Sequence, residues 1–214
     1  NASRDGALDA VAVLDDPRVR IERMGHNAGF AAACNRGAAL SASPWLLFLN
    51  PDALVEVDTL TRLLEIAQRQ PDIGLLGADV RDASGQREAA ARRRDPTLAR
   101  LWATQWARLP GGRAWAAHGL ELLPRDEALS VVDATSGALM LMPRELFRRI
   151  GGFDEGYFLH AEDLDLCRRV RDAGRQVVVA NAVPVMHVQG TSSRSRPFFV
   201  VWHKHRSLWR YFVK

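Results

Sequence analysis

The feature that most constrains this chain is a run of five apolar residues, 45–49, that ends directly in Asn50-Pro51-Asp52. A short apolar run bounded by turn residues predicts a buried strand. Open α/β sheets bind ligands at the carboxyl ends of their strands, and a carboxylate there suits a divalent metal that carries phosphates. The run therefore points to nucleotide chemistry, although Asn-Pro-Asp is also an ordinary turn in which Asp52 only caps backbone groups.

A second acidic group lies far downstream. Asp154 and Glu155 follow a pair of glycines, and Glu162, Asp163 and Asp165 open a predicted helix. Metal-assisted transfer needs one acidic site for the metal and a separate base, and the two groups supply both. The alternative is that the acidic residues at the helix start only stabilise the helix dipole.

Strand-like and helix-like segments alternate along the first part of the chain. Strands are expected at residues 18–23, 45–49 and 73–80, with helices at 31–40 and 58–70. This order predicts an α/β fold with a mostly parallel sheet flanked by helices. Residues 1–6 have the turn chemistry that normally follows a strand, so we expect the sheet to lack its first strand.

The second part of the chain is less regular at first. Residues 81–130 show no clear period, and Trp102, Trp106 and Trp115 could stack on a sugar, contact lipid or face a core, which we favour for at least one. Further on, we expect strands at 131–142, 176–180 and 183–188, and helices after Pro143, at 162–173 and at 198–213. The whole chain, 1–214, is expected to form one domain.

The composition limits the partners. A formal charge of +4 and 47% hydrophobic residues describe a globular chain with a moderate attraction for phosphates or an anionic membrane, and we expect no nucleic-acid partner. The run Arg92-Arg93-Arg94 could clamp a diphosphate, but we expect a solvated surface run. Cys34 and Cys167 are expected to be buried thiols of a cytoplasmic protein. We expect no bilayer-crossing segment.

Seven segments form a recognisable series: residues 1–6, 27–30 with 35–37, 49–52, 136–138, 151–155, 162–169, and His187 before Gly190. In order and spacing they resemble the inverting, nucleotide-sugar-dependent glycosyltransferases of family 2, which have the GT-A fold, and the rhamnosyltransferase-like branch in particular. The resemblance divides the chain into a nucleotide-sugar-binding half (1–80), an irregular region (81–130), an acceptor and catalytic half (131–195) and a basic aromatic helix (196–214).

The resemblance implies a role for each motif residue. Asp163 would be the catalytic base, and Mg²⁺ or Mn²⁺ would be held by Asp52 and His187. Asn50 departs from the family's Asp-X-Asp motif, which weakens the metal site without excluding it. The implied nucleotide-sugar-binding residues are Asn1, Asp5, Asn27, Gly29, Asn50 and Asp52, and the implied acceptor-binding residues are Glu162, Asp165, Asp133 and Gly137. Asp165 is also a rival candidate for the base.

Several of these residues have plain structural alternatives. Asn27 and Gly29 could form only a turn, and His187 could be an ordinary buried histidine. Gly137 and its small neighbours could reflect packing alone. The terminal helix, rich in aromatic and cationic residues, could dock on a membrane or close the fold as a partly buried helix.

The expected function is transfer of a hexose, with rhamnose as the first candidate, from a nucleotide diphosphate sugar to a glycan or glycolipid acceptor with inversion. The alternative is a non-catalytic module that binds a glycan or a partner. The expected location is the cytoplasm, either free or peripheral on the inner face of the cell membrane.

Overall fold

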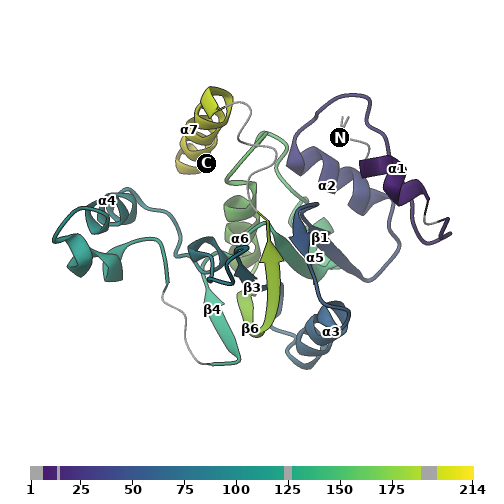
Figure 1. The fold of residues 1–214 in the computed structure, drawn as a ribbon, viewed down its shortest axis with the longest axis horizontal. Helices are drawn as coiled ribbons and strands as arrows, with labels where there is room; N and C mark the ends of the chain where they lie inside the picture. The colour runs from purple at the N-terminus through teal and green to yellow at the C-terminus, as the bar shows by residue number, and fades with distance from the viewer. Residues whose placement is uncertain (1–6, 14, 123–126, 189–196) are drawn as a thin grey trace.

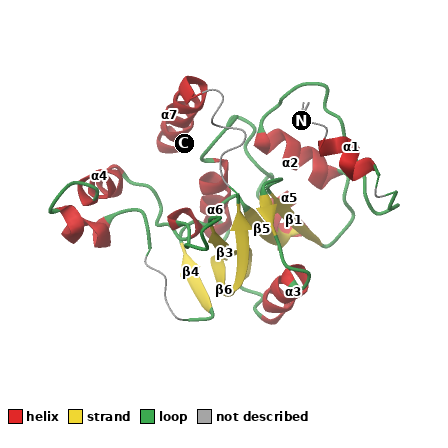
Figure 2. Cartoon of the chain, in the orientation of Figure 1, coloured by secondary structure: helices red, strands yellow, loops and turns green. Residues whose placement is uncertain are grey.

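The computed structural model describes residues 7–13, 15–122, 127–188 and 197–214. Figures 1 and 2 show a central sheet with helices on both sides and a helical hairpin that projects from the body. The helices are α1 (Ala7–Ala12), α2 (Phe30–Ala39), α3 (Thr59–Arg69), η1 (Ala89–Ala91), α4 (Leu98–Ala107), η2 (Gly112–His118), α5 (Arg144–Arg149), α6 (Glu162–Asp172) and α7 (Pro197–Val213). The strands are β1 (Trp45–Leu49), β2 (Ala53–Leu54), β3 (Ile73–Arg81), β4 (Leu129–Val132), β5 (Leu139–Pro143) and β6 (Gln176–His187).

The sheet is mixed, with strand order β1-β5-β3-β6-β2 and β4 paired to β6. β3 and β6 pair in parallel, whereas every other pairing among the described strands is antiparallel. The expectation of a mostly parallel sheet is therefore wrong in this respect. β1, β3 and β6 do run in one direction, but β5 lies between β1 and β3 and runs the opposite way.

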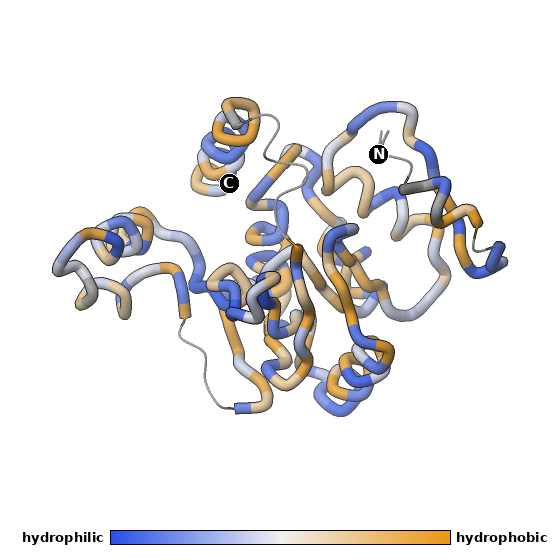
Figure 3. The backbone as a smooth tube through the Cα atoms, viewed as in Figure 1, coloured by the Kyte–Doolittle hydropathy of each residue, from blue (hydrophilic) through white to orange (hydrophobic). Residues whose placement is uncertain are grey.

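Alternate residues of each strand enter different hydrophobic clusters, as the pleat requires. Leu75 packs with side chains of α2, α5 and α6 on one face, whereas its neighbour Leu76 packs with Leu63 and Ala67 of α3 on the other. The central strands are correspondingly apolar (Figure 3). Both faces of the sheet are thus covered by helices, as expected from the sequence.

The sheet bends sharply between β1 and β2. Only three residues, 50–52, join Leu49 to Ala53, and this span covers at most about 14 Å. Four strand spacings in a flat sheet would need about 19 Å. Because Ala53 nevertheless pairs with His187, the sheet must curve, and the curvature brings the end of β1 to the end of β6.

Several predicted segments differ from the structure. Residues 18–23 form no strand, because an alternating pattern alone does not supply a pairing partner. The segment 131–142 divides into β4 and β5 at residues 133–138. The two strands expected at 176–180 and 183–188 are one strand, β6 (Gln176–His187), with a shift in register between Ala78 and Asp79 of its partner β3. The region 81–130 is more regular than predicted, since it contains η1, α4 and η2.

Candidate active site

The carboxyl ends of β1 and β6 bring two predicted metal ligands together. The backbone N–H of Val188 donates to Asp52 O at 2.9 Å, and Asp52 Oδ1 lies 3.2 Å from His187 Nε2. The other ring nitrogen, Nδ1, lies 3.1 Å from Glu88 Oε1. His187 is therefore held between two carboxylates.

Glu88 belongs to none of the motifs described above, and its place in the candidate site was not expected from the sequence. It follows a tight turn at the end of β3, where Gly85 N donates to Asp82 O at 2.9 Å, and its own N–H donates to Val80 O at 2.8 Å. The turn sequence after β3 could have predicted a hairpin that returns along this strand. Only the fold shows that the hairpin places Glu88 behind His187.

Asp52 and His187 could supply some of the ligands that a divalent cation needs. If Nδ1–H donates to Glu88, the lone pair of Nε2 faces Asp52 Oδ1, and a metal ion bound there would have both atoms as ligands. A carboxylate behind a ligating histidine is the usual arrangement around protein metals. No group of three or more His, Cys, Asp or Glu residues suited to a metal occurs within the described ranges, so phosphate oxygens of a substrate would have to complete the coordination.

Backbone contacts connect this edge to the predicted base. Asn50 N donates to Ala138 O at 3.0 Å, next to Gly137, whose N–H donates to Asp163 Oδ2 at 3.3 Å. Asp52 and Asp163 therefore belong to the same edge of the sheet. The convergence of two acidic sites follows from the antiparallel placement of β5, which begins beside the point where β1 ends.

Asp163 is held from two sides. Oδ2 also accepts a 2.6 Å hydrogen bond from Arg93, and Oδ1 accepts one from Leu164 N at 2.9 Å. The same Arg93 nitrogen donates to Thr135 O at 2.8 Å. Although burial opposes the charged guanidinium, the Asp163 carboxylate raises the pKa of Arg93. Arg93 and Gly137 thus occupy Oδ2 and fix the carboxylate, while Oδ1, which among the described residues accepts only from Leu164 N, keeps a lone pair for a further proton donor.

Glu162 lies beside this ion pair with one oxygen, Oε2, buried and without a hydrogen-bond partner among the described residues. Burial and the adjacent Asp163 charge raise the pKa of Glu162 to about 8. The raised pKa favours the protonated form of this carboxyl. The arrangement is suited to a ligand hydroxyl that would satisfy the orphaned oxygen.

Asp165 does not face a ligand. It is 1% exposed and accepts hydrogen bonds from Arg169 Nε and Lys214 Nζ, both at 2.7 Å. Tyr157 OH lies 3.5 Å from Oδ1. The expectation that Asp165 contacts the acceptor, or rivals Asp163 as base, is corrected, because residues two apart on a helix face different ways and this one anchors the end of α7.

Asp133 is also occupied within the fold. Its Oδ2 accepts from Asp95 N at 2.9 Å and lies 3.6 Å from Arg100 NH1, so the side chain fixes the start of α4. Gly137 touches Asp163 by its backbone, and a Cβ at this position would lie at an ordinary 3.5 Å from Asp163 Cβ. Of the four predicted acceptor residues, Glu162 and Gly137 thus adjoin the candidate base.

The run Arg92-Arg93-Arg94 is not the solvated surface run that we expected, and its three side chains do not point to one common site. Arg92 is 2% exposed and donates to Asp79 Oδ1 at 2.6 Å and to Asn181 Oδ1 at 2.9 Å. Arg93 binds Asp163, and Arg94 donates to Gly119 O at 2.9 Å. Three consecutive cations are thus used by three different parts of the fold.

Asn27 and Gly29 form a turn against the loop that precedes α6. Gly29 N donates to Asn27 Oδ1 at 3.1 Å, and Phe30 N donates to Phe158 O at 3.4 Å. Gly29 has φ +89°, and a Cβ there would lie 2.7 Å from Phe158 O. The glycine therefore permits the motif at residues 27–30 to approach the loop that precedes α6. Asn1 and Asp5 lie outside the described residues.

Gly29→Ala is expected to lower the free energy of unfolding by about 1–3 kcal/mol, because the side chain meets both a positive φ and a backbone oxygen. Gly25→Ala is a matched control, since Gly25 has φ +75° but open space within 4 Å. Urea denaturation of both variants separates the clash from the backbone strain. Equal losses in the two variants would contradict the close approach to Phe158.

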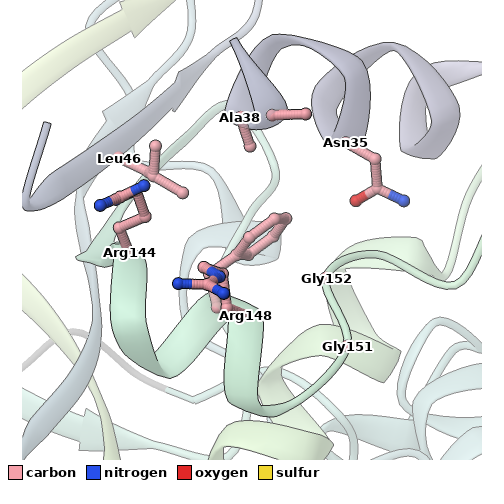
Figure 4. Close-up of a pocket in the computed structure, with 9 residues that line it drawn as sticks. Asn35, Ala38, Leu46, Arg144, Arg148, Gly151 and Gly152 are labelled. Carbon is pink, nitrogen blue, oxygen red and sulfur yellow. The ribbon is translucent and has the colours of Figure 1, made fainter. Parts of the chain in front are cut away.

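A cavity of about 330 Å³ lies elsewhere. Asn35, Leu46, Arg144 and Arg148 are among the residues that line it, between α2 and α5 (Figure 4). Leu46 stands near the start of β1, whereas Asn50 follows its end. The cavity is thus at the opposite end of the strand from the candidate site.

The comparisons with known proteins agree with this geometry. A family profile described as glycosyltransferase-like family 2 matches residues 3–208. The N-acetylglucosaminyl-diphospho-decaprenol L-rhamnosyltransferase of Mycobacterium tuberculosis is 32% identical over 223 residues, covering 97% of this chain and 70% of the relative. Rhamnosyltransferase WbbL of Escherichia coli is 28% identical over 196 residues, covering 89% of this chain and 70% of the relative.

Two solved structures share the fold at 18% identity. GalNAc-T7 with UDP, GalNAc and Mn²⁺ aligns with a TM-score of 0.61, covering 86% of this chain and 35% of the other. The mannosyltransferase PcManGT of Pyrobaculum calidifontis, in complex with GDP-Man and Mn²⁺, aligns with a TM-score of 0.57, covering 89% of this chain and 46% of the other. The chain thus spans less than half of these two proteins, and the expected GT-A fold is confirmed.

The profile covers nearly the whole chain, and the identity to the mycobacterial enzyme extends over almost all of it. The family expected from the motifs is confirmed, and with it an enzyme rather than a non-catalytic module. The chain belongs to glycosyltransferase family 2.

Proposed function

We propose that this glycosyltransferase transfers a hexose, with rhamnose as the first candidate, from a nucleoside diphosphate sugar to a lipid-linked glycan with inversion at the anomeric carbon. The names of the mycobacterial and Escherichia coli relatives support the sugar, and the mycobacterial name supports a polyprenyl diphosphate acceptor. One observation carries the chemistry: a carboxylate fixed by Arg93 and Gly137 stands at the same sheet edge as the pair Asp52 and His187.

Asp163 is proposed as the general base. Inversion requires a carboxylate on the side of the sugar opposite the leaving diphosphate, close to the acceptor hydroxyl whose proton it removes. Arg93 and Gly137 N–H direct Asp163 Oδ2, so the base is oriented before the acceptor arrives. Glu162, protonated beside it, is proposed to hydrogen-bond the acceptor through its buried oxygen.

Asp52 and His187 are proposed to hold Mg²⁺ or Mn²⁺, with Glu88 orienting His187 through Nδ1. When bound, the metal neutralises charge on the departing diphosphate. Asn50, one residue past β1, is proposed to hydrogen-bond the nucleotide sugar through its amide. The turn at Asn27 and Gly29 is proposed to bound the same pocket, and Asn1 and Asp5 are proposed to contact the nucleotide.

Glu88→Gln is expected to weaken Mn²⁺ binding about 10- to 100-fold, because a glutamine orients the imidazole without stabilising its bound form. Asp52→Ala should abolish measurable binding. Calorimetric titration of Mn²⁺ in the presence of a nucleoside diphosphate measures both. Glu56→Gln, an exposed glutamate near the same edge, is the control and should bind as the unsubstituted chain does. Unchanged affinity in Asp52→Ala would refute the metal assignment.

The donor and acceptor can be tested directly. A panel of nucleoside diphosphate sugars should be offered with N-acetylglucosaminyl-diphospho-polyprenol, and release of nucleoside diphosphate measured. We expect the rhamnosyl donor to be consumed fastest. Consumption of a different hexosyl donor would replace rhamnose but keep the reaction, whereas no turnover with any donor would refute the proposal.

The enzyme is proposed to act in the cytoplasm, at the inner face of the membrane, where α7 contacts the lipid surface. Helix α7 buries His203, Ser207 and Tyr211 against the body and exposes Trp202 and Trp209. One side of α7 thus packs on the body, as a partly buried closing helix would, and the exposed side is available for contact with a membrane. No helix among the described residues is long and apolar enough to cross a bilayer.

A further inference from the structure

The helical hairpin of α4 and η2 exposes an unusual set of apolar side chains. Trp102, Trp106 and Trp115 are 65%, 50% and 53% exposed, and Leu98 and Leu109 are more than half exposed. Leu98, Trp102 and Trp106 follow one another at intervals of four along a single helix face. We call this surface, formed by the five residues, the tryptophan arm. The expectation that at least one of these tryptophans fills the core is wrong.

The arm is held firmly, so the exposure is not a failure to pack. A Cβ on Gly112 would lie 1.8 Å from Trp106 O, which shows how closely η2 approaches the end of α4. Thr104 Oγ1 accepts from Leu120 N at 2.9 Å and donates to Arg100 O at 2.8 Å. The hairpin therefore presents its tryptophans on two closely packed helices that project from the body (Figure 1).

Three tryptophans exposed by half or more leave on the order of 300 Å² of aromatic surface in contact with water. A patch of this size lies within the range of the largest patches on typical soluble monomers, which are often functional. Tryptophan, with an apolar ring and one N–H donor, is the residue most suited to the boundary between hydrocarbon and lipid head groups.

The charged residues around the tryptophan arm indicate which kind of partner surface it would bind. Between Asp95 and Glu121 the sequence contains three arginines and no acidic residue. Arg100 lies 3.6 Å from Asp133 and Arg108 lies 3.8 Å from Glu121, yet the Arg108 side chain remains 66% exposed. Aromatic residues surrounded by cations complement a bilayer that carries anionic head groups.

A hydrogen bond links the segment before α4 to α7, which also exposes tryptophans. Asp95, just before α4, accepts hydrogen bonds from Tyr211 OH and from Arg171, both at 2.5 Å. From Pro197 to Lys214 the sequence again contains no acidic residue. Two basic, tryptophan-bearing elements are thus joined at one carboxylate.

We propose that the tryptophan arm is a docking surface for an anionic lipid bilayer, which it enters to the depth of the head groups. The inference rests on the proposed lipid-linked acceptor, because an enzyme for such an acceptor must bring its site to the membrane surface. It extends the contact from α7 to a second, structurally defined element.

The test is binding to vesicles of phosphatidylcholine with and without phosphatidylglycerol, measured by co-sedimentation and by tryptophan emission. The full 214-residue chain should bind the anionic vesicles with a shift of emission to shorter wavelength. The triple variant Trp102→Ala, Trp106→Ala, Trp115→Ala should bind about tenfold more weakly or worse. A control with Val57→Ala, Leu60→Ala and Val131→Ala, exposed apolar residues outside the arm, should bind normally.

Equal vesicle binding by the triple variant and the unsubstituted chain would overturn the proposal, as would equal binding to neutral and anionic vesicles. If vesicles do not bind but the unsubstituted chain self-associates and the triple variant does not, a second copy covers the arm and the proposal is wrong. Donor turnover with a water-soluble acceptor should be unchanged in the triple variant. Absence of that turnover in the unsubstituted chain would count against the proposed function and not against docking.

Discussion

Asp163→Asn is expected to lower kcat by about 10²- to 10⁴-fold while leaving the affinity for the nucleoside diphosphate nearly unchanged. The amide keeps the shape of the side chain and can still accept from Gly137 N–H, but it cannot take the acceptor proton. Steady-state turnover together with calorimetric titration of the nucleotide measures both quantities. We expect kcat to fall without a loss of nucleotide affinity because Asp163 contacts Gly137 and Arg93, not the pair Asp52 and His187 that is proposed to hold the diphosphate.

Two comparisons sharpen this prediction. Asp165→Asn should mainly destabilise the fold, since its oxygens bind Arg169 and Lys214. Arg93→Met should reduce kcat in the unsubstituted chain but add little to Asp163→Asn, because a residue that acts by orienting the base has no effect once the base is gone. Near-normal turnover in Asp163→Asn, or a larger loss in Asp165→Asn at equal folded fraction, would refute the assignment of the base.

Asp79→Asn is expected to lower the free energy of unfolding by about 3–5 kcal/mol, because it leaves the guanidinium of Arg92 buried without a counter-charge. Asp79 is 0% exposed and binds Arg92 at 2.6 Å, with Arg81 and Arg87 at 2.8 and 3.1 Å. Equilibrium denaturation in urea measures the loss. Asp82→Asn, three residues further in an exposed turn, is the matched control and should change stability by less than about 0.5 kcal/mol.

The pH dependence of this loss has a definite sign. Burial alone would raise the pKa of Asp79, but the bonds from Arg92 and Arg81 outweigh it and lower the pKa. A carboxyl whose pKa is lower in the folded state adds stability above its ordinary pKa and loses it as the pH falls through the lowered value. The difference between the unsubstituted chain and Asp79→Asn should therefore shrink in acid. A difference that grows in acid would contradict the ion pair.

The sequence predicted most elements of this fold because periodicity and capping act locally. The strand of residues 45–49 and the helices near 31–40, 58–70, 162–173 and 198–213 occur close to the expected positions. The direction of β5 was not predictable, since an apolar run does not indicate whether a strand is parallel or antiparallel to the strands that it pairs with. The same reason explains why one predicted strand, at residues 18–23, found no partner.

Side-chain environment was harder to predict than the backbone. In the sequence, Arg92 resembles an exposed surface cation. Its buried position is seen only in the structure, where Asn181, at the shift in register between β3 and β6, accepts a hydrogen bond from it. The spacing of Trp102 and Trp106 predicts one helix face but cannot say whether another element covers it. Glu88 belongs to the candidate site only because a hairpin returns along β3.

The sequence alone determined the family, most of the elements and the two acidic motifs, because apolar period, turn chemistry and motif spacing are properties of neighbouring residues. Tertiary structure decided which carboxylates face the candidate site and which are used inside the fold. Asp163 and Asp165 are equivalent as sequence, but one meets Arg93 and Gly137 at the sheet edge, while the other is buried against Lys214. That choice depends on contacts between residues far apart in the chain, which only the curvature of the sheet and the placement of β5 bring together.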